Sequence, residues 1–163
     1  MFTDKFIGNK ALLYSLLVFA ALSFCSCKKL EPNEVLGAKL QRAVTLGSNT
    51  HLSLDTAIND FEWDILVIKR PYASRSMEDT LQKYIDNRNQ LLLSENDQTE
   101  GWNYLIFVSG QKAVAYIRLP EAPCCSFSGN NLDNPVVLKK HEAVFRIGRQ
   151  MYKSKTHYTL ILE

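Results

Sequence analysis

Hydrophobic residues recur with a helical period in two segments of the chain. Residues 33–46 (NEVLGAKLQRAVTL) place four apolar side chains on one face, and Asn33 stands where an N-cap is expected. A second stripe follows Ser76, which opens a Ser-x-x-Asp cap, and it ends near Asn87–Asn89. These two patterns predict amphipathic helices.

A period of two predicts strands in much of the remaining chain. The clearest is Phe61–Lys69 (FEWDILVIK), which is apolar on both faces and is therefore expected inside a sheet. Asn103–Val108 and Lys112–Leu119 flank Ser109-Gly110-Gln111, which is a hairpin signal. The other predicted strands are a short one near Leu52–Leu54, one at Ala143–Ile147 and one at His157–Leu162, the last two separated by a basic turn over Gly148–Lys155.

Together these segments predict an α+β fold: a mostly antiparallel sheet of five or six strands with two helices packed on one face. Pro120–Pro135 (PEAPCCSFSGNNLDNP) is expected to be a long loop. The length of the chain suits one domain, and we place a single α+β domain at residues 34–163.

The first 27 residues differ from the rest. Met1–Lys10 is mildly basic, and Ala11–Phe24 is apolar and uncharged. As a helix those 14 residues would span about 21 Å, against roughly 30 Å for the hydrocarbon core of a bilayer. A secretory signal peptide over residues 1–26 is therefore favoured, and an uncleaved anchor helix is the alternative.

The run LSFCSCKKL around Cys25 and Cys27 resembles the lipobox of bacterial lipoproteins, particularly the loose form of the Bacteroidetes group. The resemblance implies that signal peptidase cuts before Cys27, which small Ser26 precedes, and that Cys27 carries fatty acyl chains such as palmitate. The alternative register uses Cys25, with bulky Phe24 before the cut. Residues 27–33 would then be the lipidated cysteine and a tether. The implied location is the bacterial cell envelope, at the outer membrane or on its periplasmic face, and the membrane is the first predicted partner.

The charge balance argues against polyanionic ligands. The chain has 19 basic and 17 acidic residues, and cleavage before Cys27 would leave 17 and 16. Such a balance creates no broad positive field, so we expect no nucleic-acid partner.

Cys124 and Cys125 are adjacent in the predicted long loop. A strained vicinal disulfide and a redox switch are the sharper interpretations, but we expect two free or partly buried thiols in a surface loop. His51, His141 and His157 are far apart in the sequence, and no nucleophile motif such as G-x-S-x-G accompanies them. The sequence therefore predicts no catalytic residue, no metal ligand and no cofactor.

Phe61-Glu62-Trp63-Asp64 followed by Pro71-Tyr72 is the most distinctive local pattern. It resembles a motif of small secreted or lipid-anchored bacterial proteins without established activity, and the likeness extends loosely through Trp102–Pro120. The favoured interpretation places Phe61 and Trp63 in the core, with Asp64 either capping a turn or pairing with a basic residue. In the alternative, Trp63, Asp64 and Tyr72 form a partner-binding surface.

The leading functional hypothesis is a non-catalytic binding module held at a membrane, whose partner is for example another envelope protein. A second hypothesis is a small hydrolase or thiol-dependent enzyme that uses Cys124 or Cys125. A third is a structural lipoprotein that supports an outer-membrane assembly.

Overall fold

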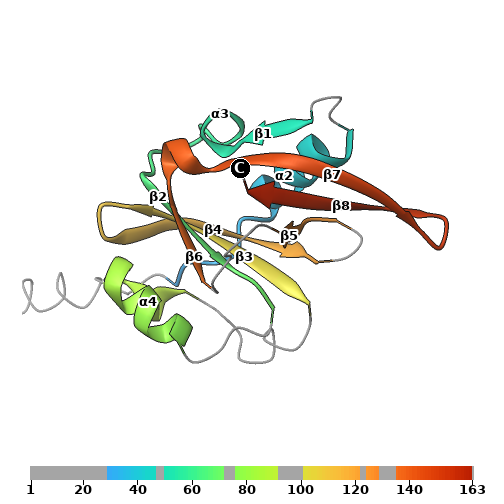
Figure 1. Cartoon of the computed structure of the whole chain (residues 1–163). Coiled ribbons are helices and arrows are strands. Elements are labelled where there is room, and N and C mark those ends of the chain that lie inside the picture. The colour runs from blue at the N-terminus through green and yellow to red at the C-terminus, as the bar shows by residue number, and fades with distance from the viewer. Residues whose placement is uncertain are drawn as a thin grey trace, which may run out of the picture.

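The computed structural model describes residues 29–46, 50–71, 76–91, 101–121, 124–128 and 135–162. They form a mixed α+β structure in which strands predominate (Figure 1). The helical elements are α2 (Glu34–Leu46), α3 (Leu54–Ala57), α4 (Ser76–Tyr84) and the 3₁₀ turns η1 (Arg88–Gln90) and η3 (Lys140–Glu142). The strands are β1 (His51–Ser53), β2 (Ile65–Lys69), β3 (Trp102–Ser109), β4 (Lys112–Pro120), β5 (Ser126–Ser128), β6 (Val136–Lys139), β7 (Val144–Tyr152) and β8 (Lys155–Leu162).

The strands form two four-stranded sheets, so the prediction of one sheet of five or six strands is wrong. One sheet has the order β4-β3-β2-β6 and is wholly antiparallel. The other has the order β1-β7-β8-β5, with β5 parallel to β8. The six predicted strands divide three and three between the sheets, because periodicity identifies strands without identifying their partners. The segment expected to be a long loop adds β5 to one sheet, and β6, directly after it, joins the other.

The two sheets pack around a shared core, here called the inner core. Each sheet gives it alternate residues, as the period of two requires. Leu66 and Ile68 come from β2, and Phe145 and Ile147 come from β7. The helix α2 adds Leu36, Leu40 and Val44 to the same core, and the side-chain oxygen of Asn33 accepts a hydrogen bond from Leu36 N at 3.0 Å, as predicted for the N-cap.

A second cluster, here called the outer core, lies on the opposite face of the β4-β3-β2-β6 sheet. Its buried members from the sheet include Val67, Tyr104 and Ile106. Leu81 of α4 and Ile85 just beyond it cover this face. The prediction that both helices pack on one face is therefore wrong, because β2 and β3 are apolar on both faces and each face needs its own cover. Figure 1 shows α4 on the side of this sheet away from β7 and β8.

The predicted hairpin of β3 and β4 is confirmed, and it turns at Gly110 with φ of +61°. One irregularity was not predicted: Phe107 pairs with Ala115 and Val108 with Ala113, so Val114 is an extra, bulged residue.

The strand predicted at Phe61–Lys69 is shorter than expected, because β2 begins only at Ile65. The backbone N–H of Asp64 still donates to Val108 O at 2.9 Å. The chain before it bends back toward Ile58, whose carbonyl accepts a hydrogen bond from Trp63 Nε1.

The chain is already attached to the domain at Leu30. Leu30 N donates to Gln90 O at 2.7 Å, and Asn33 N donates to Tyr116 O at 2.8 Å. Leu30 also forms a parallel bridge with Leu91 and packs against the outer core. Two residues of the predicted tether, Leu30 and Asn33, are therefore bound to the domain. The signal peptide, Cys25 and Cys27 lie outside the described residues, and none of the described helices is long and apolar enough to span a bilayer.

Candidate interaction surface

Trp63 belongs to the inner core, as the favoured interpretation of its motif predicts. Its side chain is 3% exposed, and its ring meets the ring of Phe107 edge-on with centroids 5.2 Å apart. The indole N–H is satisfied by Ile58 O at 3.1 Å. A partner cannot reach this ring, so Trp63 contributes nothing to a binding surface.

Asp64 is exposed, and its hydrogen bonds connect its own segment to the β3–β4 hairpin and to η3. Its carboxylate accepts a hydrogen bond from Gly110 N at 3.2 Å, at the tip of the β3–β4 hairpin. Its carbonyl accepts one from Lys140 N at 2.8 Å, at the start of η3. This is the turn-capping role that the sequence suggested. Tyr72, the third residue of the alternative surface, lies outside the described residues.

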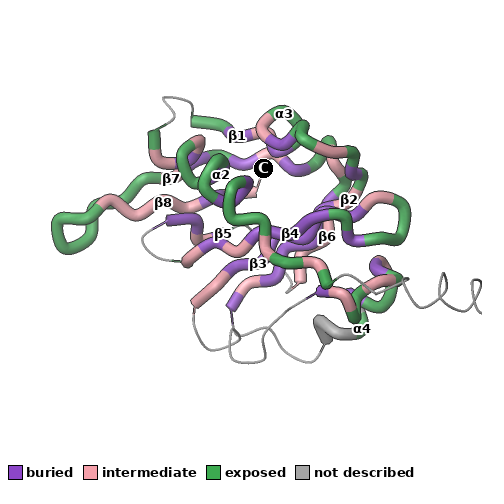
Figure 2. Tube along the Cα trace, turned by 180° about the vertical axis from the view of Figure 1, so that it is seen from behind, coloured by how far each residue is buried: buried purple, intermediate pink, exposed green. Residues whose placement is uncertain are grey.

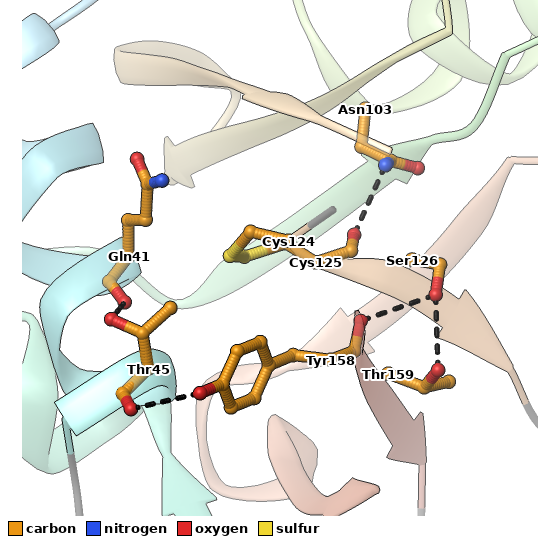
Figure 3. The surroundings of a disulfide bond; sticks show 8 residues. All are labelled: Gln41, Thr45, Asn103, Cys124, Cys125, Ser126, Tyr158 and Thr159. Atoms are coloured by element: carbon orange, nitrogen blue, oxygen red, sulfur yellow. Dashed lines mark hydrogen bonds between the residues drawn. A yellow bond between two sulfur atoms is a disulfide. The ribbon is translucent and has the colours of Figure 1, made fainter. Parts of the chain in front are cut away.

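The adjacent cysteines form a disulfide, and both are buried in the inner core. Figure 3 shows the pair beside α2 and Tyr158. Asn103 of β3, itself 1% exposed, donates from Nδ2 to Cys125 O at 3.1 Å. The expectation of thiols in a surface loop is wrong, because the pairing of β5 with β8 draws this segment between the sheets.

That arrangement leaves the sulfurs unsuited to nucleophilic chemistry. A cysteine acts as a nucleophile through its free thiolate, and reactive cysteines are typically partly exposed. Cys124 and Cys125 are bonded to each other, with relative exposures of 2% and 0%.

The three histidines are not brought together. His51 pairs with Arg146 and His157 with Gln150, so they sit four residues apart along β7, roughly 13 Å at the rise of a strand. His141 lies on η3 and faces Glu142 at 3.9 Å. Among the described residues, no three histidine, cysteine or acidic side chains gather into a potential metal site.

The structure instead exposes a surface that the sequence did not indicate. Beyond Ile147, whose N–H donates to Thr50 O, strand β7 leaves the neighbourhood of β1. β8 joins β5 only from Thr159 onward. Residues 148–158 are therefore a two-stranded ribbon, here called the β7–β8 arm, which projects from the body of the molecule (Figures 1 and 2).

The arm carries large exposed side chains near its tip. Met151 is 66% exposed and Tyr152 is 57% exposed. The rings of Tyr152 and His157 meet edge-on with centroids 5.8 Å apart, and Thr156 Oγ1 lies 3.3 Å from Met151 Sδ. These contacts within the ribbon hold two apolar side chains in the solvent on an otherwise polar element.

The arm is also basic. No acidic residue occurs from Ala143 to Leu162, whereas the arm itself contains Arg149, Lys153 and Lys155. The Arg149 guanidinium lies 5.9 Å from the centre of the Tyr158 ring, and Lys153 Nζ lies 5.3 Å from that of Tyr152. A cation thus lies near an aromatic ring both at the base of the arm and at its tip.

The basic turn predicted over Gly148–Lys155 is wrong in its length. The strands continue to Tyr152 and resume at Lys155, so the turn consists of Lys153 and Ser154. Both have positive φ, 45° and 64°, as a two-residue hairpin turn whose twist matches the strands requires. Lys-Ser is not a recognisable signal for that turn, whereas Tyr152, Thr156 and Tyr158 on either side are of residue types enriched in strands.

The chain matches no protein-family model, and neither a curated protein nor a solved structure is significantly similar to it.

Proposed function

We propose that this protein is a lipid-anchored component of the bacterial cell envelope whose domain binds a partner protein without transforming it. The observation that carries the proposal of binding is the β7–β8 arm, a projecting ribbon with Met151 and Tyr152 in solvent. Tyrosine, methionine and arginine are the residue types enriched at protein interfaces, and all three occur on the arm.

The proposed anchor rests on the N-terminal sequence. An apolar run of signal-peptide length leads to Cys27, with small Ser26 before it. Only Lys28 and Lys29 separate Cys27 from Leu30, which makes the first described contact with the domain. Several acyl chains on one cysteine make a stable anchor, because each buried CH₂ contributes about 0.8 kcal/mol.

The anchor is tested by feeding an alkyne-tagged fatty acid to cells that produce the full chain. Cys27→Ser should abolish the label, whereas Cys25→Ser should retain it. If only Cys25→Ser loses the label, the signal peptide is cleaved before Cys25. If the variant with both substitutions keeps the label, the protein is not a lipoprotein of this kind.

The binding role is tested by chemical crosslinking in the native cell, followed by purification from the membrane. One reproducible partner should be recovered with the intact chain and not with the Cys25→Ser/Cys27→Ser control. Failure to recover a partner at any crosslinker length would contradict protein binding. An envelope defect on deletion of the protein, together with that failure, would favour the structural lipoprotein instead.

A further inference from the structure

We infer that the β7–β8 arm docks onto an acidic surface of a partner protein. This inference rests on the proposed function and specifies the chemistry of the partner. It starts from the charge of the ribbon: three cations at Arg149, Lys153 and Lys155, with no carboxylate from Ala143 to Leu162. The rest of the chain nearly balances its charges, so the arm is a local positive feature on an almost neutral molecule.

The two faces of the arm carry different side chains. Residue pairing places Gln150, Tyr152, Lys155 and His157 on one face, and Arg149, Met151, Thr156 and Tyr158 on the other. Each face therefore combines a cation with a large apolar or aromatic group. A partner protein would therefore contact a cation and an apolar or aromatic group on whichever face of the arm it binds.

That combination fits a protein better than a simple polyanion. Interface hot spots are enriched in tyrosine and arginine, and the energy comes from apolar contact while peripheral charges steer association. Met151 and Tyr152 supply the apolar contact at the tip, and Lys153 and Lys155 flank them. A ligand that offered charge alone would leave both exposed apolar side chains unused.

The position of the arm argues against lipid headgroups as its target. The segment that leads to the proposed anchor attaches at Leu30, on the outer core, which covers the far face of the β4-β3-β2-β6 sheet. The arm extends from the other sheet, on the opposite side of the inner core (Figure 1). A domain anchored through residue 27 would hold its Leu30 side near its own membrane and present the arm to other molecules.

The test places a photo-crosslinking amino acid at exposed Gln150 in the full-length chain, in its native cell. Gln150 lies on the arm, and its substitution removes neither a cation nor an exposed apolar side chain. The crosslinked protein is recovered, and the attached peptide of the partner is identified by mass spectrometry. Parallel experiments use vesicles of phosphatidylglycerol and phosphatidylcholine, and double-stranded DNA, as probes for the other polyanions.

Charge variants give the test its specificity. In Lys153→Glu/Lys155→Glu the crosslinked yield should fall roughly tenfold, because attraction becomes repulsion. Lys153→Arg/Lys155→Arg should retain it. The matched control, Lys83→Glu/Arg88→Glu, reverses two exposed cations of α4 and η1 and should also retain it. Circular dichroism of each variant verifies that the fold is intact.

An adduct on a peptide rich in Asp and Glu, lost only in the arm reversal, is the expected result. Three other results would overturn the inference. They are an adduct on a peptide without acidic residues, an adduct whose yield neither charge reversal changes, and arm-dependent binding to the vesicles or to DNA. The absence of any adduct from Gln150 would overturn it as well. Recovery of a partner in the anchor-dependent crosslinking would in that case still support the proposed function, through a different surface.

Discussion

At the scale of single residues, the polar side chains that matter most for this fold connect strands that are distant in the sequence. Asp64 joins the end of one loop to the tip of the β3–β4 hairpin, 46 residues later. Asn103 joins β3 to the segment with the disulfide, 22 residues later. In each connection a side chain is hydrogen-bonded to a backbone group of a distant residue. No sequence pattern marks such a contact, so the role of Asn103 was not predicted.

Asp64→Ala should lower the free energy of unfolding by about 1 kcal/mol, because Gly110 N–H loses its carboxylate acceptor at an exposed site. Asp64→Asn keeps an oxygen acceptor and should recover most of that loss. Urea unfolding of both variants measures the difference. Equal destabilisation by both substitutions would show that charge, and not the hydrogen bond, accounts for the effect.

Asn103→Ala should lower the free energy of unfolding by more, about 1–3 kcal/mol, because the buried carbonyl of Cys125 loses its side-chain donor. The same unfolding experiment measures it, with Asn89→Ala, on exposed η1, as the control. A loss no larger than that of the control would mean that Cys125 O finds a replacement donor.

At the scale of elements, the sequence predicted the features that have a strong local pattern. The helix at α2, the hairpin of β3 and β4 and the doubly buried β2 each show a clear periodicity or turn residue. Trp63 was also correctly predicted to be buried, but not through strand periodicity: it precedes β2 and lies in the inner core with Leu66 and Ile68, whereas a continuous strand would have put it on the face of Val67.

The missed elements are short and depend on distant partners. β5 and β6 have three and four residues, too few to show a period. β5 exists because it pairs with Thr159–Ile161, and β6 because it pairs with Ile65–Ile68. The arm was missed for another reason: strands without a buried face have no apolar alternation to read. The β7–β8 arm therefore could not be predicted from apolar periodicity.

The turn of the arm offers a direct test of its geometry. Lys153 and Ser154 both adopt positive φ, which is costly for residues with a Cβ. Lys153→Asn/Ser154→Gly, the preferred pair for such turns, should stabilise the ribbon by about 1 kcal/mol. Amide hydrogen exchange in residues 149–157 should slow roughly fivefold, since that is the factor that about 1 kcal/mol represents. Faster exchange in the variant would contradict this turn.

At the scale of the whole molecule, the first described contacts set how closely the proposed anchor holds the domain. From Cys27 to Leu30 the chain can span at most about 11 Å. Within the predicted tether of residues 27–33, Leu30 and Asn33 are hydrogen-bonded to the domain. The domain should sit against the bilayer with its Leu30–Leu91 side.

This orientation can be measured with the lipidated protein in vesicles that contain an acceptor dye. A donor dye at Asn89, on η1 next to the Leu30 contact, should transfer energy more efficiently than one at Ser154 on the arm. A flexible Gly/Ser insert of 20 residues between Lys28 and Lys29 should abolish most of the difference. Similar transfer from both positions in the protein without the insert would contradict the orientation.

Paired photo-crosslinking in the native cell tests whether the anchored domain binds its partner through the arm. One chain carries the crosslinker at Gln150 on the arm and another carries it at Asn89 on the opposite side, each with Cys27 intact or with the Cys25→Ser/Cys27→Ser change. We expect a protein adduct from Gln150 in the anchored chain, and none from Asn89 or from the unanchored chain. A protein adduct from Asn89 alone, or one from Gln150 that persists at full yield without the anchor cysteines, would contradict it.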